Sequence, residues 1–384
     1  MSKYKIMTPG PVQVPENVRL ARSLSTTNAD LDPQFYDEYK ETCELISELL
    51  HTKNETLILS GEGILGLEAA CASMTEPGDR VLILDNGIYG AGFADFVSMY
   101  GGTPVMYTKD YKNAFDVDEL DAYLKEDHDF KYATVVHCDT PSGMLNDIHK
   151  ICPLLKSYGI MTVTDSVSGM FGNEVNVDKA QIDILCGGSQ KAVSAPPGLT
   201  FVTISDEAKK VMENRKTPIA SFYCNLTIFK DYYKNLWFPY TMPISDIYGL
   251  KAAMDNIAAD KDLIKRHARI ANATRKAIEA FGLKLHLESG FSDTVTVFDV
   301  PEGMTADDIL ERMREKHGIM LAGSFGELAG KVIRIGHMGA SANVGDMLEV
   351  MSGLEETLRY LGWRSENSFC LLYTSPSPRD STSS

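Results

Sequence analysis

Between residues 56 and 204 the chain repeats a short apolar segment followed by a segment of helix length, and this alternation constrains its fold more than any other feature. The apolar segments are short and rich in β-branched residues, which is typical of strands buried on both faces of a sheet. The expected strands are 56–60, 81–85, 105–108, 133–138, 160–165, 182–186 and 199–204. The expected helices between them are 66–74, 90–100, 116–125 and 148–157.

This order predicts an α/β fold, with a mainly parallel seven-stranded sheet covered by helices on both faces. Ligands of such sheets bind beyond the carboxyl ends of the strands. We therefore expect the functional residues of this chain at those ends.

The segments that flank this region predict the remaining organisation. Prolines at positions 9, 11 and 15 predict an extended arm over residues 1–16, and a large domain is expected over 17–250, with a helix over 33–50. A long helical pattern over 245–281 leads into a small α+β domain over 251–363. Its expected strands are 283–287, 294–298 and 332–335, and its expected helices are 305–316 and 344–361. Residues 364–384 are rich in serine and proline, which predicts a disordered tail that need not be native sequence.

Composition limits the partners and the location of the protein. The 53 acidic and 37 basic residues give a net charge of −16, which argues against a nucleic acid or an anionic membrane as partner. No long apolar run occurs, and the first residues lack the apolar stretch of a signal peptide. The seven cysteines are scattered, without the spacing of a metal site. We expect a cytoplasmic protein with reduced thiols and no metal.

A lysine, a carboxylate and a glycine-rich turn lie at the carboxyl ends of three of the expected strands. Lys191 lies between Gly187-Gly188-Ser189-Gln190 and the rigid turn Ala195-Pro196-Pro197-Gly198, which is typical of a positioned side chain; its simpler interpretation is an ordinary loop lysine. Asp165 ends an apolar strand, where a carboxylate is costly unless paired; its simpler role is a cap. The turn at Gly61 to Gly66 opens a helix, whose first N–H groups can hold a phosphate.

Together these three features meet the needs of pyridoxal phosphate. The lysine forms a Schiff base, the carboxylate keeps the ring nitrogen protonated, and the helix N-terminus holds the phosphate.

The glycine-rich turn also has a second interpretation. Gly61-Glu62-Gly63-Ile64-Leu65-Gly66 fits the dinucleotide fingerprint G-x-G-x-x-G, and Asp85 ends the next strand, near the position of a ribose-binding acid. A nicotinamide-dependent dehydrogenase would follow. The turn comes only after an arm and a long helix, however, and no hydride-transfer site is evident downstream. These points favour the phosphate of a smaller cofactor.

Several short stretches occur in a characteristic order between residues 8 and 336. They are Thr8-Pro9-Gly10-Pro11, Ser60-Gly61-Glu62-Gly63, Leu67-Glu68-Ala69-Ala70, Pro77-Gly78-Asp79, Asn86-Gly87-Ile88-Tyr89-Gly90, Thr140-Pro141-Ser142-Gly143, Asp165-Ser166-Val167-Ser168, Gly188-Ser189-Gln190-Lys191-Ala192, Ala195-Pro196-Pro197-Gly198 and Arg334-Ile335-Gly336. No single stretch is specific, but jointly they make the chain resemble a class V aminotransferase of the fold-type I pyridoxal-phosphate enzymes. Within the class it most resembles alanine–glyoxylate and serine–pyruvate aminotransferases. The resemblance implies an aspartate-aminotransferase-like fold and pyridoxal 5′-phosphate as cofactor.

The resemblance also implies roles for individual residues. Lys191 would form the Schiff base and shuttle the proton, and Asp165 would pair with the ring nitrogen. Tyr89 would stack on the ring, and Thr140 would hydrogen-bond near its phenolic oxygen or its nitrogen. The phosphate would be held by three backbone N–H groups and one amide side chain, from Glu62, Gly63, Ile64 and Gln190. The substrate carboxylate would bind Arg334, whose planar fork suits it, in a pocket that Gly10 also lines.

In this class a tyrosine and a threonine of the neighbouring subunit complete the phosphate site. The resemblance therefore implies a homodimer with active sites shared between subunits. Thr241 matches the threonine. The tyrosine position aligns with Phe238, which has no hydroxyl, so Tyr240 is the candidate replacement.

The activity implied by the resemblance is a ping-pong transamination from alanine or serine to glyoxylate or pyruvate. Within the class, a ureidoglycine–glyoxylate aminotransferase is the alternative. A phosphonate-specific relative would need a further cation, and none is evident. A cysteine desulfurase would need a reactive cysteine in the C-terminal part, where only Cys370 follows Cys224. From another class, the nicotinamide-dependent dehydrogenase is the alternative.

Overall fold

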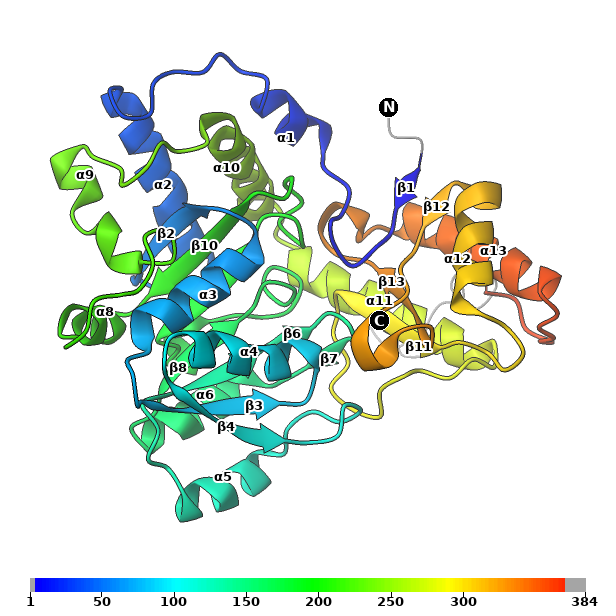
Figure 1. Cartoon of the computed structure of the whole chain (residues 1–384). Helices are drawn as coiled ribbons and strands as arrows, with labels where there is room; N and C mark the ends of the chain where they lie inside the picture. The colour runs from blue at the N-terminus through cyan, green and yellow to red at the C-terminus, as the bar shows by residue number, and fades with distance from the viewer. Residues whose placement is uncertain (1–3, 370–384) are drawn as a thin grey trace, which may run out of the picture.

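A computed structural model describes residues 4–369 of the chain, and its centre is a seven-stranded sheet (Figure 1). The strand order is β2–β10–β9–β8–β5–β3–β4. β10 runs antiparallel to both of its neighbours and the other pairs are parallel, which confirms the predicted mainly parallel sheet. The strands are β2 (Glu55–Ser60), β3 (Arg80–Asp85), β4 (Thr103–Thr108), β5 (Tyr132–Val136), β8 (Met161–Asp165), β9 (Ile184–Gly188) and β10 (Leu199–Ile204).

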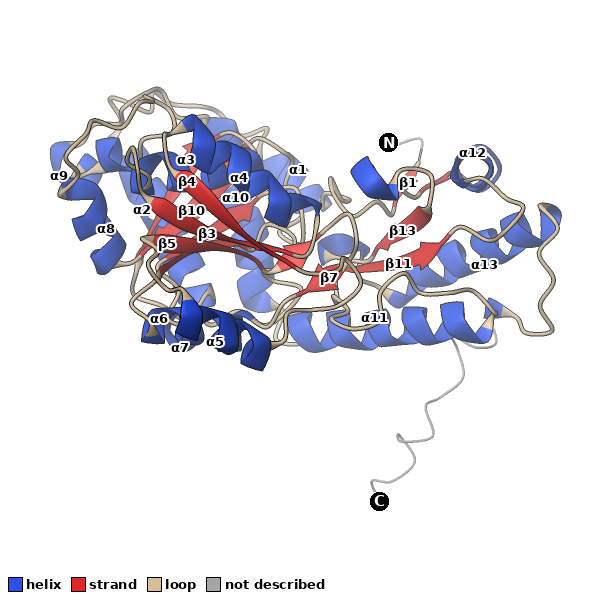
Figure 2. Ribbon diagram, turned by 60° about the horizontal axis from the view of Figure 1, so that its bottom comes forward, coloured by secondary structure: helices blue, strands red, loops and turns tan. Residues whose placement is uncertain are grey.

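Helices cover both faces of this sheet (Figure 2). On one face lie α3 (Gly63–Met74) and α4 (Ile88–Met99). On the other face lie α5 (Val117–Glu126), α6 (Ile148–Ser157) and α7 (Val177–Ala180). The remaining helices of this part are α1 (Glu16–Ala21), α2 (Pro33–Leu49), α8 (Asp206–Glu213), the 3-10 turn Leu226–Phe229, α9 (Tyr232–Asn235) and α10 (Ile244–Ala259). No helix within residues 4–369 combines the length and the apolarity needed to cross a membrane.

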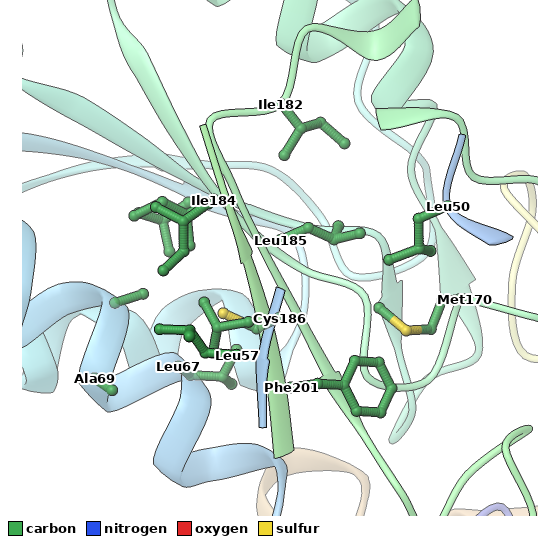
Figure 3. Packing of buried hydrophobic residues seen from close by; sticks show 14 of the residues in the cluster. Leu50, Leu57, Leu67, Ala69, Met170, Ile182, Ile184, Leu185, Cys186 and Phe201 are labelled. Atoms are coloured by element: carbon green, nitrogen blue, oxygen red, sulfur yellow. The ribbon is translucent and has the colours of Figure 1, made fainter. Parts of the chain in front are cut away.

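The packing of β9 shows why these strands are apolar throughout. Ile184 and Cys186 point toward Leu67 of α3, while Leu185 between them points to the opposite side of the sheet (Figure 3). All three strand residues are buried. A strand alternates its side chains between the two faces, so a sheet that is covered on both faces selects apolar residues at every position.

A second cluster of buried residues forms the core of the C-terminal part. It surrounds an antiparallel pair of strands, β11 (Val295–Asp299) and β13 (Val332–Gly336), and the helices that pack on them. These helices are α11 (Leu263–Ala280), α12 (Ala306–His317) and α13 (Val344–Tyr360). The remaining elements of the described chain are short. The strands are β1 (Lys5–Ile6), β6 (Cys138–Asp139), β7 (Met144–Leu145) and β12 (Ile319–Met320), and the 3-10 turns are Gly326–Leu328 and Gly339–Ser341.

Two details of the sequence prediction are wrong in this region. The helical pattern over 245–281 is not one helix, because Asp260 takes an extended backbone and ends α10. The segment 283–287 is not a strand of the sheet: only Leu285 forms an isolated bridge, with Phe298. Apolar periodicity continues through both places, so it could not reveal either interruption.

The change from one cluster of buried residues to the other occurs later in the sequence than the predicted domain boundary. A boundary between residues 250 and 251 falls inside α10. Met254 and Ile257 of α10 belong to the first cluster, the buried residues around the seven-stranded sheet, as does Leu263 of α11. From Ile270 onward, α11 contributes to the second cluster. We propose that the two domains meet within α11.

The N-terminal arm predicted over residues 1–16 connects the two clusters. Within its described part, β1 pairs with β12, and Met7 is buried in the second cluster. Five residues later, the N–H of Val12 donates to the carbonyl of Gln190 at 3.2 Å, next to Lys191. The arm therefore joins the second core to the loop that carries the lysine.

Most of the tail predicted over residues 364–384 lies outside the described residues, which end at residue 369. The described part departs from the prediction. Phe369 is fully buried, and its ring stacks on Phe281 with the centroids 4.0 Å apart. The packed structure thus extends to residue 369.

A glycine inside α3 gives a test of how this helix is held against the sheet. A Cβ on Gly66 would clash with Oγ1 of Thr200, which is itself fixed by donating to the carbonyl of Gly187 at 2.6 Å. We expect Gly66→Ala to lower the free energy of unfolding by about 1–3 kcal/mol through overpacking. Gly92→Ala in α4 is the matched control: apart from its chain neighbours and the backbone of its own helix, no atom of residues 4–369 lies within 4 Å of its added Cβ. The control should gain about 0.5–1 kcal/mol. Denaturant unfolding measures both variants, and an equal loss in the two would contradict the packing.

Candidate active site

A cavity of about 320 Å³ lies where β2, β8 and β9 end, at the carboxyl edge of the sheet. It is lined by Gly10, Pro11, Glu62, Gly63, Ile64, Leu67, Tyr89, Thr140, Asp165, Val167, Ser168, Gln190, Lys191 and Pro197. This set contains every predicted site residue except Arg334 and Thr241. A larger groove of about 810 Å³ beside α2 and α9 contains none of them.

Lys191 reaches the cavity from the loop after β9. Its Nζ donates to the carbonyl of Pro9 at 2.8 Å and lies 3.5 Å from Oγ1 of Thr140. Burial lowers the pKa of the Lys191 ammonium to about 8, and the charge of Arg334 acts in the same direction. An appreciable share of this lysine is therefore the neutral, nucleophilic amine near neutral pH.

Asp165 is the last residue of β8 and is buried. Its Oδ1 accepts a hydrogen bond from the N–H of Val167 at 2.9 Å, so the simpler capping role considered from the sequence is also present. Burial nevertheless raises the pKa of this carboxyl to about 7, although the Val167 N–H and the charge of Lys191 oppose the shift. A cationic group beside Asp165 would stabilise the ionised form of this carboxyl.

Gly10 explains the proline-rich motif of the arm. Its φ is +104°, and an added Cβ would lie 2.5 to 2.8 Å from the last atoms of the Lys191 side chain. Only glycine combines this backbone conformation with so close an approach. The arm thus forms the wall against which the lysine rests.

Tyr89 is placed by an acid that the sequence analysis did not single out. Tyr89 lies in the first turn of α4, and its N–H donates to Oδ1 of Asp139 at 2.9 Å. Asp139 is buried and also accepts from the hydroxyl of Ser142 at 2.6 Å. The signal was available: Asp139 is an acid directly after an apolar strand, as Asp165 is.

Ser168 is a second residue that was missed. It lines the cavity, and its hydroxyl is hydrogen-bonded to that of Thr140. It belongs to the motif Asp165-Ser166-Val167-Ser168, so its position near Asp165 could have been inferred.

Glu62, Gly63 and Ile64 form the beginning of α3 at one end of the cavity. A Cβ on Gly63 would lie 2.9 Å from Cγ2 of Val167, so glycine lets the helix start approach the cavity closely. The carboxylate of Glu62 accepts from the N–H of Ile64 at 2.9 Å and from Nε2 of Gln190 at 3.0 Å. Two of the predicted phosphate donors are thus engaged by a side chain of the protein.

Arg334 lies beside the cavity rather than in its wall. Its Nη1 donates to the carbonyl of Thr140 at 3.2 Å, and its Nε donates to the carbonyl of Gly323. The guanidinium lies over the ring of Phe325, which in turn contacts Tyr89 edge-on at 6.2 Å between centroids. Burial lowers the pKa of Arg334, which still remains a cation.

Thr241 is not brought to this cavity by its own chain, and it is exposed. Phe238 is buried, with its ring stacked on Tyr36 at 4.5 Å and on Tyr232 at 5.6 Å. This apolar setting explains the absence of a hydroxyl at Phe238. Tyr240 stacks on Tyr223 at 4.5 Å. The roles of Thr241 and Tyr240 toward a second subunit stay predictions.

Comparison with known proteins identifies the family to which this chain belongs. Residues 18–336 match the family model of the class V aminotransferases. The chain is 34% identical to the pyridoxamine–pyruvate transaminase of Mesorhizobium japonicum, over 88% of this chain and 86% of that protein. It is 30% identical to the alanine–glyoxylate aminotransferase of Callithrix jacchus, over 92% and 87%. The crystal structure of ureidoglycine–glyoxylate aminotransferase from Bacillus subtilis has a TM-score of 0.92 at 30% identity and covers 97% of both chains.

The sheet also removes the dinucleotide interpretation of the turn at Gly61 to Gly66. β2 lies at the edge of the sheet, and its neighbour is the antiparallel strand β10. A dinucleotide fingerprint requires that the turn and its helix join two neighbouring parallel strands, whereas four strands separate β2 from β3, the strand that follows α3.

The cofactor of class V aminotransferases is pyridoxal 5′-phosphate, and the residues of the cavity fit it. Lys191 offers an amine for covalent attachment, and the raised pKa of Asp165 marks a carboxyl that a protonated ring nitrogen would stabilise. The start of α3 and Gln190 also line the cavity, where the N–H of Ile64 and the amide of Gln190 are engaged by the carboxylate of Glu62. When bound, the cofactor supplies an electron sink for the substrate. Residues 4–369 hold no cluster of ligands suited to a metal ion.

The shifted pKa values predict how cofactor attachment depends on pH. Attachment requires the neutral amine of Lys191, whose fraction rises with pH through about 8, and it is favoured by the ionised Asp165, whose fraction rises through about 7. We expect the rate to increase between about pH 6 and 9. Stopped-flow absorbance after mixing cofactor-free protein with pyridoxal 5′-phosphate measures it. Asp165→Asn should retain only the upper transition, and a rate that is flat over this range would contradict the burial of Lys191.

Proposed function

Because the chain belongs to the class V aminotransferase family, we propose that it transfers an amino group from a small amino acid to a small 2-oxo acid by a ping-pong mechanism. The proposed donor is alanine or serine, and the proposed acceptor is glyoxylate or pyruvate. One observation carries the proposal: Lys191 and Asp165, each with a pKa shifted toward neutrality, face the same cavity with Arg334 beside it.

The residues of the chain divide the work between them. Lys191 holds the cofactor and then moves a proton at Nζ, for which a pKa of about 8 is well suited. With the cofactor bound, Asp165 would keep the proton on its ring nitrogen and Tyr89 would stack on its ring. Asp139 fixes Tyr89 by accepting from its backbone N–H.

Arg334 is the proposed carboxylate receptor. Within the described chain, two of the five N–H groups of its guanidinium donate to the carbonyl oxygens of Gly323 and Thr140. These two bonds fix the plane of the guanidinium and leave further N–H groups for a substrate carboxylate. The same anchoring serves an amino acid and a 2-oxo acid, as a ping-pong exchange requires.

A ureidoglycine–glyoxylate transamination is the second candidate. Its support is the extent of the structural similarity to an enzyme of that name, with a TM-score of 0.92 over nearly the whole chain. It differs from the first candidate in the amino donor and shares the acceptor glyoxylate.

We also propose that the protein is a homodimer in which Thr241 contributes to the site of the partner. Large apolar side chains are exposed in the same region of the chain, at Phe222, Tyr223, Leu236 and Trp237. Clustered exposed aromatic residues are typical of protein interfaces. A cytoplasmic location is part of the proposal, because the six cysteines of the described chain are all free.

The dimer can be tested at its exposed aromatic surface. We expect light scattering of the wild-type protein to give twice the mass of the chain. Trp237→Asp should give monomers, because the interface loses its apolar centre. These monomers should bind the cofactor more weakly, because Thr241 of a partner is then missing from the site. Tyr360→Asp is the control, since Tyr360 is also exposed but lies at the end of α13. Wild-type protein with the mass of one chain would contradict the dimer.

The activity is tested by offering alanine with glyoxylate, serine with pyruvate, and ureidoglycine with glyoxylate, and by quantifying products by mass spectrometry. We expect turnover with at least one pair and its loss by several orders of magnitude in Lys191→Ala, which removes both the anchor and the proton carrier. Lys179→Ala is the control, because Lys179 is exposed in α7. Full activity in Lys191→Ala would refute the mechanism.

A further inference from the structure

The phosphate end of the cavity contains a negative group that belongs to the protein itself. Both oxygens of the Glu62 carboxylate are engaged: Oε1 accepts from the N–H of Ile64 at 2.9 Å, and Oε2 accepts from Nε2 of Gln190 at 3.0 Å. These are donors that a phosphate at the start of α3 would otherwise use.

The charge around Glu62 is not compensated in the cavity wall. Among the described residues that line the cavity, one is a cation, Lys191, and two are carboxylic acids, Glu62 and Asp165. Burial is the main cause that raises the pKa values of Asp165 and Tyr89, but the charge of Glu62 also contributes to both. The carboxylate of Glu62 therefore acts on the ring half of the site as well. A phosphate dianion beside it would meet a like charge.

Gln190 gives a second, independent indication. It is buried, and its Oε1 has no hydrogen-bond partner among residues 4–369. Because Nε2 donates to a carboxylate, the orientation of the amide is fixed and the unpaired atom is an acceptor. A buried acceptor without a donor is costly. A phosphate dianion brings no proton to this end of the cavity, whereas a hydroxymethyl group can donate its O–H to the carboxylate of Glu62.

We propose that Glu62 takes the place of the phosphate as acceptor for these donors, and that the cavity also binds an unphosphorylated vitamin B6 compound, pyridoxal or pyridoxamine, as an exchanging substrate. The inference rests on the proposed function, because it assigns the same roles to Lys191 and Asp165. Without the phosphate as a permanent anchor, the compound leaves after each half-reaction.

The corresponding reaction is balanced without a further reactant. Pyridoxamine and a 2-oxo acid give pyridoxal and an amino acid. The aminomethyl carbon of pyridoxamine is oxidised to the aldehyde, the carbonyl carbon of the 2-oxo acid is reduced to a carbon bearing the amino group, and oxygen and nitrogen exchange places. The residues that bind and move protons are those of the proposed transamination.

The test is a pair of binding titrations of cofactor-free protein, with pyridoxal and with pyridoxal 5′-phosphate, followed by visible absorbance. We expect wild-type protein to bind pyridoxal at least as tightly as the phosphate ester. Glu62→Gln keeps the size of the side chain and removes its charge, so we expect it to shift the affinity ratio toward the ester by about tenfold or more. Glu68→Gln is the matched control on the same helix, because Glu68 pairs with the hydroxyl of Tyr100 outside the cavity.

The outcomes separate this inference from the proposed function. Wild-type protein that prefers the phosphate ester by about a hundredfold, with an unchanged ratio in Glu62→Gln, would overturn the inference and leave the transamination intact. Wild-type protein that binds neither compound would overturn the proposed function. Mass spectrometry of pyridoxamine incubated with pyruvate should show pyridoxal and alanine, and their absence would count against exchange. Far-UV circular dichroism checks that Glu62→Gln is folded.

Discussion

The site depends on two oppositely charged residues that are held close to one another at the ends of neighbouring strands but are not bonded to each other. Asp165 ends β8 and accepts from Val167, while Lys191 follows β9 and donates to Pro9. Burial raises the pKa of the acid to about 7 and lowers that of the lysine to about 8. Burying these two ionisable side chains carries an unfavourable desolvation free energy, and perturbed pKa values of this kind are common at functional sites.

The rest of the structure keeps these two groups in place. The strands β8 and β9 are parallel, so their carboxyl ends lie at the same edge of the sheet, and helices cover both of its faces. The arm closes the site over Lys191 through Gly10, and it is anchored in the second core by Met7. Arg334 of β13 joins the same site from the second core through the carbonyl of Thr140. The cavity therefore depends on both cores.

The sequence was sufficient for the sheet, since apolar β-branched runs and their spacing determined all seven strands, and for the lysine and acid at the strand ends. It did not reveal that Asp260 interrupts a helical pattern or that Phe369 packs on Phe281, because neither residue changes the apolar periodicity. It also could not show that the carboxylate of Glu62 engages Ile64 and Gln190. The contact with Gln190 joins residues that are 128 positions apart in sequence, and only the folded chain brings Gln190 to the start of α3.

The central claim is that Lys191 is the covalent anchor of the cofactor in this cavity. Reducing the protein with borohydride after adding pyridoxal 5′-phosphate makes the attachment permanent, and peptide mass spectrometry then locates it. The account predicts one modified site, in the peptide that contains Lys191. Modification of a different lysine, or none in protein that remains active, would contradict it.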